Sequence, residues 1–168
     1  RISWADIQNH NFSFSDRMDH YEDILVPRGS QWIVNFIQRH IPNKNAYTPW
    51  QAVNQIVRGL AKDLSFGNNN ELWNTLPHLA SGKANHEDFT RAFNAAAREL
   101  GFKARPVTGF WTNNTGPRMW SEIFMPGVGW LPVDIEASEY YCPTGEYAYF
   151  VGTHSYGNQL GAVAIAPS

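Results

Sequence analysis

The spacing of apolar residues changes at Gly101, and this change limits the fold more than any other feature of the sequence. Before it, apolar side chains recur every three or four residues, as in Val53, Ile56, Val57 and Leu60, which is typical of an amphipathic helix. After it, they alternate with a period of two, which is typical of strands with one buried face. Because helices come first and strands follow, the order predicts an α+β fold with helices packed on an antiparallel β-sheet.

The element boundaries follow from capping and turn residues. Ser30 and Thr48 are the expected N-caps of two helices, the second of which starts with a proline, and Gly101 is the expected stop of a third helix that starts near residue 85. A short helical turn is expected within residues 72–82. The expected strands span residues 103–111, 118–125, 130–135, 147–151 and 160–165.

The size and composition of the chain indicate one folded domain. It has 168 residues, of which 43% are hydrophobic, enough for a core and too apolar for a disordered chain. We expect an N-terminal arm and helix over residues 1–47, a core over 48–135 and C-terminal strands over 136–168. Residues 25–30 read Leu-Val-Pro-Arg-Gly-Ser, as in a thrombin-cleavable linker. We interpret this as coincidence, because the preceding residues contain no tag-like run.

Charge and hydropathy exclude two classes of partner. The net charge of −2 and a sequence pI of about 6.3 predict no nucleic-acid partner. No stretch approaches the roughly 20 apolar residues of a membrane helix, so no membrane span is predicted. The only cysteine, Cys142, excludes an internal disulfide but leaves the compartment open. An extracytoplasmic or secreted bacterial protein is the favoured interpretation.

Three stretches of the central region carry a family resemblance. Residues 84–89 read Ala-Asn-His-Glu-Asp-Phe and open the third helix, which leads through Leu-Gly-Phe-Lys-Ala-Arg at residues 100–105. Residues 118–122 read Arg-Met-Trp-Ser-Glu, and residues 129–134 read Gly-Trp-Leu-Pro-Val-Asp. In order, spacing and flanking residues, these stretches resemble the transglutaminase-like superfamily, which has a papain-like core. The resemblance implies a Cys-His-Asp triad where the helix meets the sheet.

The sequence departs from the family pattern at two of the three triad positions. His86 stands at the cysteine position and Arg118 at the histidine position, and only Asp134 is retained. An imidazole cannot form a thioester, and a guanidinium remains protonated and cannot act as a base. Thiol catalysis is therefore not expected at this site. Cys142 follows the third motif and is expected to be incidental.

The leading interpretation is a degenerate domain that serves as a ligand-binding or scaffold module. His86 at a helix N-terminus and Arg118 near it would form a cleft that favours anions such as a carboxylate, a phosphate or an acidic peptide. The simpler alternative is that Arg118 pairs with Asp134 and only neutralises a buried charge. Because both interpretations remain open, the sequence leaves undecided whether the protein is an enzyme.

The alternative function is a hydrolase with rebuilt chemistry that acts on cell-wall glycan or another polysaccharide. Glycoside hydrolysis needs two carboxyl groups. Glu122, on the strand face of Trp120, would supply one of them beside His86 and Asp134. Glu87 and the two aromatic side chains of Trp120 and Trp130 are candidate ligand-binding residues.

Structural explanations compete with these roles. Glu87 has Arg91 one turn further along its helix, and Asp88 complements the helix N-terminus. No short-spaced cluster joins His86 and Asp134 to His78 or His154, so no metal and no cofactor is predicted.

Overall fold

The computed structural model describes residues 23–67, 74–111, 117–127, 129–135, 148–154 and 159–165. Its helices are α2 (Gln31–His40), the 3-10 helix η1 (Lys44–Ala46), α3 (Pro49–Asp63), α4 (Thr75–Ser81) and α5 (His86–Glu99). Its strands are β1 (Ser65–Phe66), β2 (Lys83–Ala84), β3 (Ala104–Trp111), β4 (Pro117–Met125), β5 (Gly129–Val133), β6 (Ala148–His154) and β7 (Gln159–Ile165). The α+β prediction is confirmed.

The expected boundaries hold at most element ends. Thr48 caps α3 with a capping box, and Pro49 occupies the first turn, as the sequence predicted. The turn after α5 contains Gly101 at φ 97°, a conformation that favours glycine. Ser30 stands at the N-cap of α2, but its side chain makes no capping hydrogen bond, so that part of the prediction is wrong. The expected arm before residue 23 lies outside the described residues.

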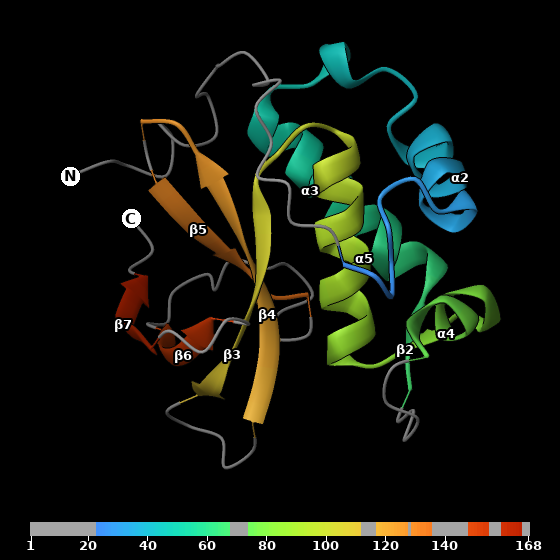
Figure 1. Cartoon of the computed structure of the whole chain (residues 1–168). Coiled ribbons are helices and arrows are strands. Elements are labelled where there is room, and N and C mark those ends of the chain that lie inside the picture. The colour runs from blue at the N-terminus through green and yellow to red at the C-terminus, as the bar shows by residue number, and fades with distance from the viewer. Residues whose placement is uncertain are drawn as a thin grey trace.

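Helix α5 lies between the sheet and the other helices (Figure 1). It contacts β3 and β4 on one side and α2, α3 and α4 on its other sides. The apolar residues of α5 that face these neighbours, Ala92, Phe93, Ala95, Ala96 and Ala97, have no exposed surface. The small side chains allow the neighbouring elements to approach closely, and the burial of apolar surface is the main favourable term in folding.

The main sheet has the strand order β5-β4-β3-β6-β7, and all neighbours are antiparallel. Its two faces differ in what covers them. Ile123 and Met125 belong to the core that the helices share, whereas Trp120 is buried but lies outside that core. Because side chains alternate along a strand, Ser121, Ile123 and Met125 face α5, and Trp120, Glu122 and Phe124 face away.

Helix α2 packs closely on α3 at a glycine. A Cβ atom at Gly59 would lie 2.8 Å from Cγ of His40 and 2.8 Å from Cζ of Phe36. That is closer than carbon atoms normally approach, so the absence of a side chain at this position allows the two helices to meet. The contact places the C-terminal end of α2 beside the second half of α3.

Residues 25–30, which resemble a protease-cleavable linker, are part of the fold. Val26 has no exposed surface and belongs to the core. The amide of Ser30 donates to the carbonyl of Pro27 at 2.9 Å, which forms the turn that leads into α2. The interpretation of this hexapeptide as coincidence is therefore supported. Among the described residues, no helix has the length and apolar character needed to cross a membrane.

Candidate functional site

The N-terminus of α5 is held by a reciprocal pair of hydrogen bonds. The amide of Asp88 donates to Oδ1 of Asn85 at 2.9 Å, and the amide of Asn85 donates to Oδ2 of Asp88 at 3.1 Å. This capping box satisfies two backbone donors that the helix itself leaves unpaired. His86 is consequently fixed as the first residue of the helix.

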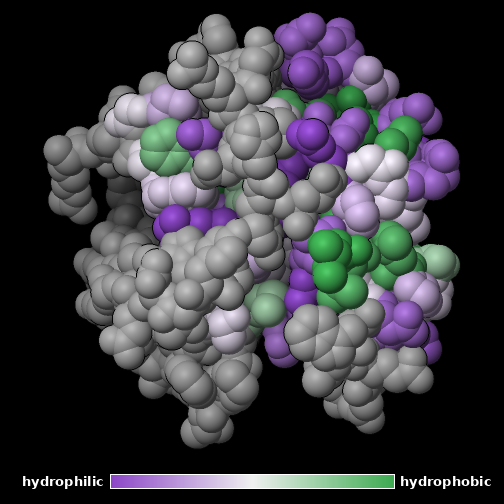
Figure 2. All heavy atoms as spheres, viewed as in Figure 1, coloured by the Kyte–Doolittle hydropathy of each residue, from purple (hydrophilic) through white to green (hydrophobic). Residues whose placement is uncertain are grey.

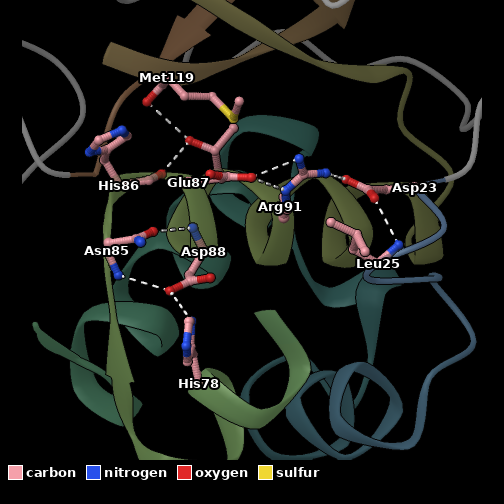
Figure 3. A network of polar contacts seen from close by, with 10 residues as sticks. Asp23, Leu25, His78, Asn85, His86, Glu87, Asp88, Arg91 and Met119 are labelled. Carbon is pink, nitrogen blue, oxygen red and sulfur yellow. Dashed lines mark hydrogen bonds and ion pairs between the residues drawn. The ribbon is translucent and has the colours of Figure 1, made fainter. Parts of the chain in front are cut away.

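A histidine from α4 supports the capping box. Nδ1 of His78 lies 3.0 Å from Oδ2 of Asp88 (Figure 3). The carboxylate of Asp88 is only 3% exposed, and a buried carboxylate needs several hydrogen-bond partners. The prediction that Asp88 complements the helix N-terminus is confirmed. His78 serves as its partner, and it does not line the hollow beside His86.

A small hollow opens beside His86, between the first turns of α5 and the strands β4 and β5. Its volume is about 10 Å³, enough for about one water molecule, and it is partly open to solvent. Among the described residues, the polar ones that line it are His86, Thr90, Ser121 and Asp134, and the apolar ones are Phe89, Val133 and Ile135. The structure therefore brings together two of the predicted site residues, His86 and Asp134.

Two hydroxyl groups join α5 to β4 at this hollow. Oγ1 of Thr90 lies 2.7 Å from the carbonyl oxygen of His86 and 3.1 Å from that of Met119 (Figure 3). Ser121, on β4, donates from its Oγ to the carbonyl of Thr90 at 3.4 Å. These contacts hold the first turns of α5 against the strand. Thr90 and Ser121 were not among the predicted site residues, although the four-residue spacing from His86 to Thr90 was a signal for the first of them.

Glu87 points away from the hollow and is paired. Nε of Arg91 donates to Oε1 of Glu87 at 3.0 Å, and Nη2 donates to the same oxygen at 2.8 Å. Arg91 also binds Asp23, which precedes α2 (Figure 3). Burial of the guanidinium would lower the pKa of Arg91, but its two carboxylate partners raise it. The predicted Glu87–Arg91 pair is confirmed, whereas a ligand-binding role for Glu87 stays a prediction.

Glu122 lies on the opposite face of the sheet from the hollow. Nε and Nη2 of Arg105 are each 2.7 Å from Oε2 of Glu122, and the guanidinium of Arg105 stacks 3.7 Å from the ring centroid of Trp130. Trp130 in turn contacts Phe124 at 5.4 Å between centroids. The expectation that Glu122 approaches His86 is therefore not met. The error lay in the face of β4, because Ser121 and not Glu122 points toward α5.

The remaining candidates are placed only in part. Trp120 is 2% exposed on the far face of the sheet, and it does not line the hollow. Arg118 lies in β4 opposite Gly109 of β3, and its side chain is outside the described part of the chain, as are Cys142 and the side chain of His154. In the described part of the chain, no group of three or more His, Cys, Asp or Glu side chains is arranged to hold a metal ion.

A comparison with protein families identifies the fold. The model of the transglutaminase-like superfamily matches residues 37–135, which is more than half of the chain. The chain belongs to the transglutaminase-like superfamily. A search of curated proteins found no significant match.

Two solved structures share this fold. One is a candidate cysteine protease from Cytophaga hutchinsonii, with a TM-score of 0.63 and 12% identity, which covers 87% of this chain. The other is a candidate protease from Parabacteroides distasonis, with a TM-score of 0.50 and 12% identity over 79% of this chain. The present chain spans 51% and 28% of their lengths, and at this identity the likeness concerns the fold alone.

The hollow is lined by His86 and Asp134, the residues that the resemblance aligns with two of the triad positions. His86 occupies the start of the central helix, and Asp134 follows the last strand of the motif region, directly after β5. The side chain that lines the hollow at position 86 is an imidazole instead of a thiol.

Proposed function

We propose that this transglutaminase-like domain lacks thiol catalysis and binds a small anionic ligand at the hollow beside His86. The observation that carries the proposal is that His86, at the first position of α5, lines the hollow together with Asp134. A thiolate is the nucleophile in the chemistry of related enzymes, and imidazole cannot replace it in a thioester.

The charge around the helix N-terminus supports an anion. The hollow adjoins the first turns of a 14-residue helix, and the positive end of a helix favours negative groups. The carboxylates of Glu87 and Asp88 in the first turn are bound by Arg91 and by Asn85 and His78, and neither lines the hollow. Asp134 also lines the hollow, so an anion can bind there only where the charge of this carboxylate is neutralised.

Thermal unfolding with citrate, phosphate and an acidic peptide tests the proposal. A ligand that binds only the folded state raises the melting temperature, and the increase grows with the logarithm of its concentration above Kd. We expect protection of the wild type and none of His86→Glu, which puts a carboxylate into the hollow. Ala61→Glu, at an exposed position of α3, is the matched control and should keep the protection. Equal protection of both variants, or none of the wild type, would contradict the proposal.

The glycan hydrolase alternative has weaker support than the sequence suggested. Its second carboxylate, Glu122, is bound to Arg105 on the other face of the sheet. Release of reducing ends from peptidoglycan and a panel of polysaccharides tests this alternative directly. Activity that disappears in both His86→Ala and Glu122→Gln would establish it and would overturn the binding-module proposal.

A further inference from the structure

An exposed turn leads into α2. Arg28 and Gly29 are exposed at its tip, and a Cβ atom at Gly29 would have no atom beyond the neighbouring residues within 4 Å. Ile24, shortly before the tip, is 90% exposed. Figure 2 shows hydrophobic surface along the course that the segment before α2 takes in Figure 1. Exposed tips with small or polar residues are the places where proteases most often cut a folded chain.

Arg28 differs from the other basic residues in the part of the chain that the structure describes. It is exposed and lies outside every helix and strand. The other exposed Lys and Arg residues of that part lie in regular elements and are Arg39, Lys44, Arg58, Lys62 and Lys83. Backbone hydrogen bonds hold the peptide bonds of helices and strands, so those elements must unfold before a protease can bind them.

The residues around Arg28 suit a serine protease that cuts after arginine. A trypsin-like enzyme holds the basic side chain before the cut in a pocket that contains a carboxylate. The hexapeptide over residues 25–30 has the sequence of a thrombin-cleavable linker. The dipeptide Pro-Arg recurs at residues 117–118, but there it belongs to β4, where Arg118 is paired with Gly109 of β3. The same dipeptide thus occurs in an exposed turn and within a sheet.

We propose that the peptide bond between Arg28 and Gly29 is a processing site for a serine protease that recognises Pro-Arg. Hydrolysis adds one water molecule across this bond and leaves a carboxylate on Arg28 and an amino group on Gly29. None of residues 23–30 is among the described residues that line the hollow beside His86. The inference is therefore independent of the proposed function.

The strap, which we define as residues 23–28, is attached to the rest of the fold by its own contacts. Oδ2 of Asp23 binds Nη1 of Arg91 on α5, and both side chains are largely buried (Figure 3). Oδ1 of Asp23 accepts from the amide of Leu25 at 2.9 Å, and Val26 belongs to the core. These contacts do not depend on the bond that is cut. The strap therefore stays bound after cleavage, and the product is a protein of two chains.

Cleavage requires the strap to open locally. A protease binds several residues on each side of the bond in an extended form, whereas here the amide of Ser30 donates to the carbonyl of Pro27 at 2.9 Å and Val26 is buried. Where opening and closing are faster than cutting, the cleavage rate follows the population of the opened form. The pair of Asp23 and Arg91 opposes opening, so loss of this pair should speed the cut.

Digestion of the native protein with thrombin tests the processing site. Mass spectrometry under denaturing conditions should show a single cut after Arg28 and none after Arg118. Gel filtration should show that the two fragments elute together. Arg28→Gln removes the side chain that the protease recognises, so this variant should remain intact.

The two carboxylates that bind Arg91 provide a matched pair of variants. Asp23→Asn weakens the attachment of the strap and should raise the cleavage rate about tenfold. Glu87→Gln removes the other partner of Arg91 and leaves the strap attached, so it should be cut at the wild-type rate. Circular dichroism should show that both variants are folded under the conditions of digestion.

Four results would overturn the inference. The first is a native protein that stays intact under conditions that cut a synthetic peptide of residues 23–33. The second is cleavage after Arg118 as fast as after Arg28, which would mean that only the unfolded chain is cut. The third is separation of the fragments in gel filtration, and the fourth is equal cleavage rates of Asp23→Asn and Glu87→Gln. The last two would show that the contact of Asp23 does not hold the strap.

Discussion

Nδ1 of His78 lies 3.0 Å from the carboxylate of Asp88, so a side chain of α4 supports the cap of the helix that carries His86. The same carboxylate oxygen accepts the backbone hydrogen bond of Asn85. The site residue therefore depends on a buried network that includes no residue of the hollow itself.

Asp88→Ala should lower the free energy of unfolding by about 1–3 kcal/mol, because it removes the cap and leaves His78 and the amide of Asn85 without this partner. Urea unfolding measures the change. Glu99→Gln, at an exposed position of the same helix, should change stability by less than about 0.5 kcal/mol. If Asp88→Ala and Glu99→Gln had the same free energy of unfolding, the capping box would contribute little to stability.

His86→Cys should restore a reactive thiol without restoring catalysis. A thiol at a helix N-terminus ionises more readily than a free cysteine, so alkylation by iodoacetamide should be fast near neutral pH. The measurement uses a Cys142→Ser background, with exposed Ser81→Cys as the control thiol. Slower alkylation at position 86 than at position 81 would contradict the proposed electrostatics of the hollow. Amidase activity in this variant would mean that a residue other than histidine serves as the base.

Glu122→Gln should destabilise the protein without affecting ligand protection. The carboxylate of Glu122 is 6% exposed and holds Arg105 against Trp130, so its neutralisation should cost about 1–3 kcal/mol. A double-mutant cycle with Arg105→Ala isolates the pair interaction. If Glu122→Gln abolished anion protection at unchanged stability, Glu122 would have to act at the hollow after all.

Stability should fall in acid partly through Asp63. Burial opposes its ionisation, but hydrogen bonds from Arg39 and His40 outweigh this effect and hold the pKa of Asp63 below its usual 3.8. A carboxyl group whose pKa is lower in the folded state stabilises the protein above the unfolded pKa, and this contribution is lost as the pH falls below about 4. Asp63→Asn should therefore show a smaller loss of melting temperature between pH 6 and pH 3 than the wild type. An equal loss in both proteins would assign the acid sensitivity to other groups.

Much of the fold followed from local pattern. The helix over residues 49–63 was predictable because its cap, its first proline and its apolar stripe lie within one short segment. The same holds for the pair Glu87–Arg91, which one helical turn brings together. Side chains that are neighbours through a regular element can be located from spacing alone.

The composition of the site was harder to predict, as Glu122 and Ser121 illustrate. Alternation along β4 correctly separates them onto two faces, but it does not indicate which face meets α5. That choice depends on how the helix packs across the strand, where Thr90 contacts the carbonyl of Met119 and accepts from Ser121. A shift of one residue would exchange the two faces.

The sequence by itself determined the order of the helices and strands, because each element depends on residues close together in the chain. It also determined the family and the absence of a cysteine at position 86, because both follow from matching residues to a motif. Only the tertiary structure decided that Thr90 and Ser121 join His86 and Asp134 at one hollow while Arg105 holds Glu122 on the other face. The physical reason is that contacts between α5 and the sheet join residues about 30 positions apart, and strand alternation does not specify which face receives the helix.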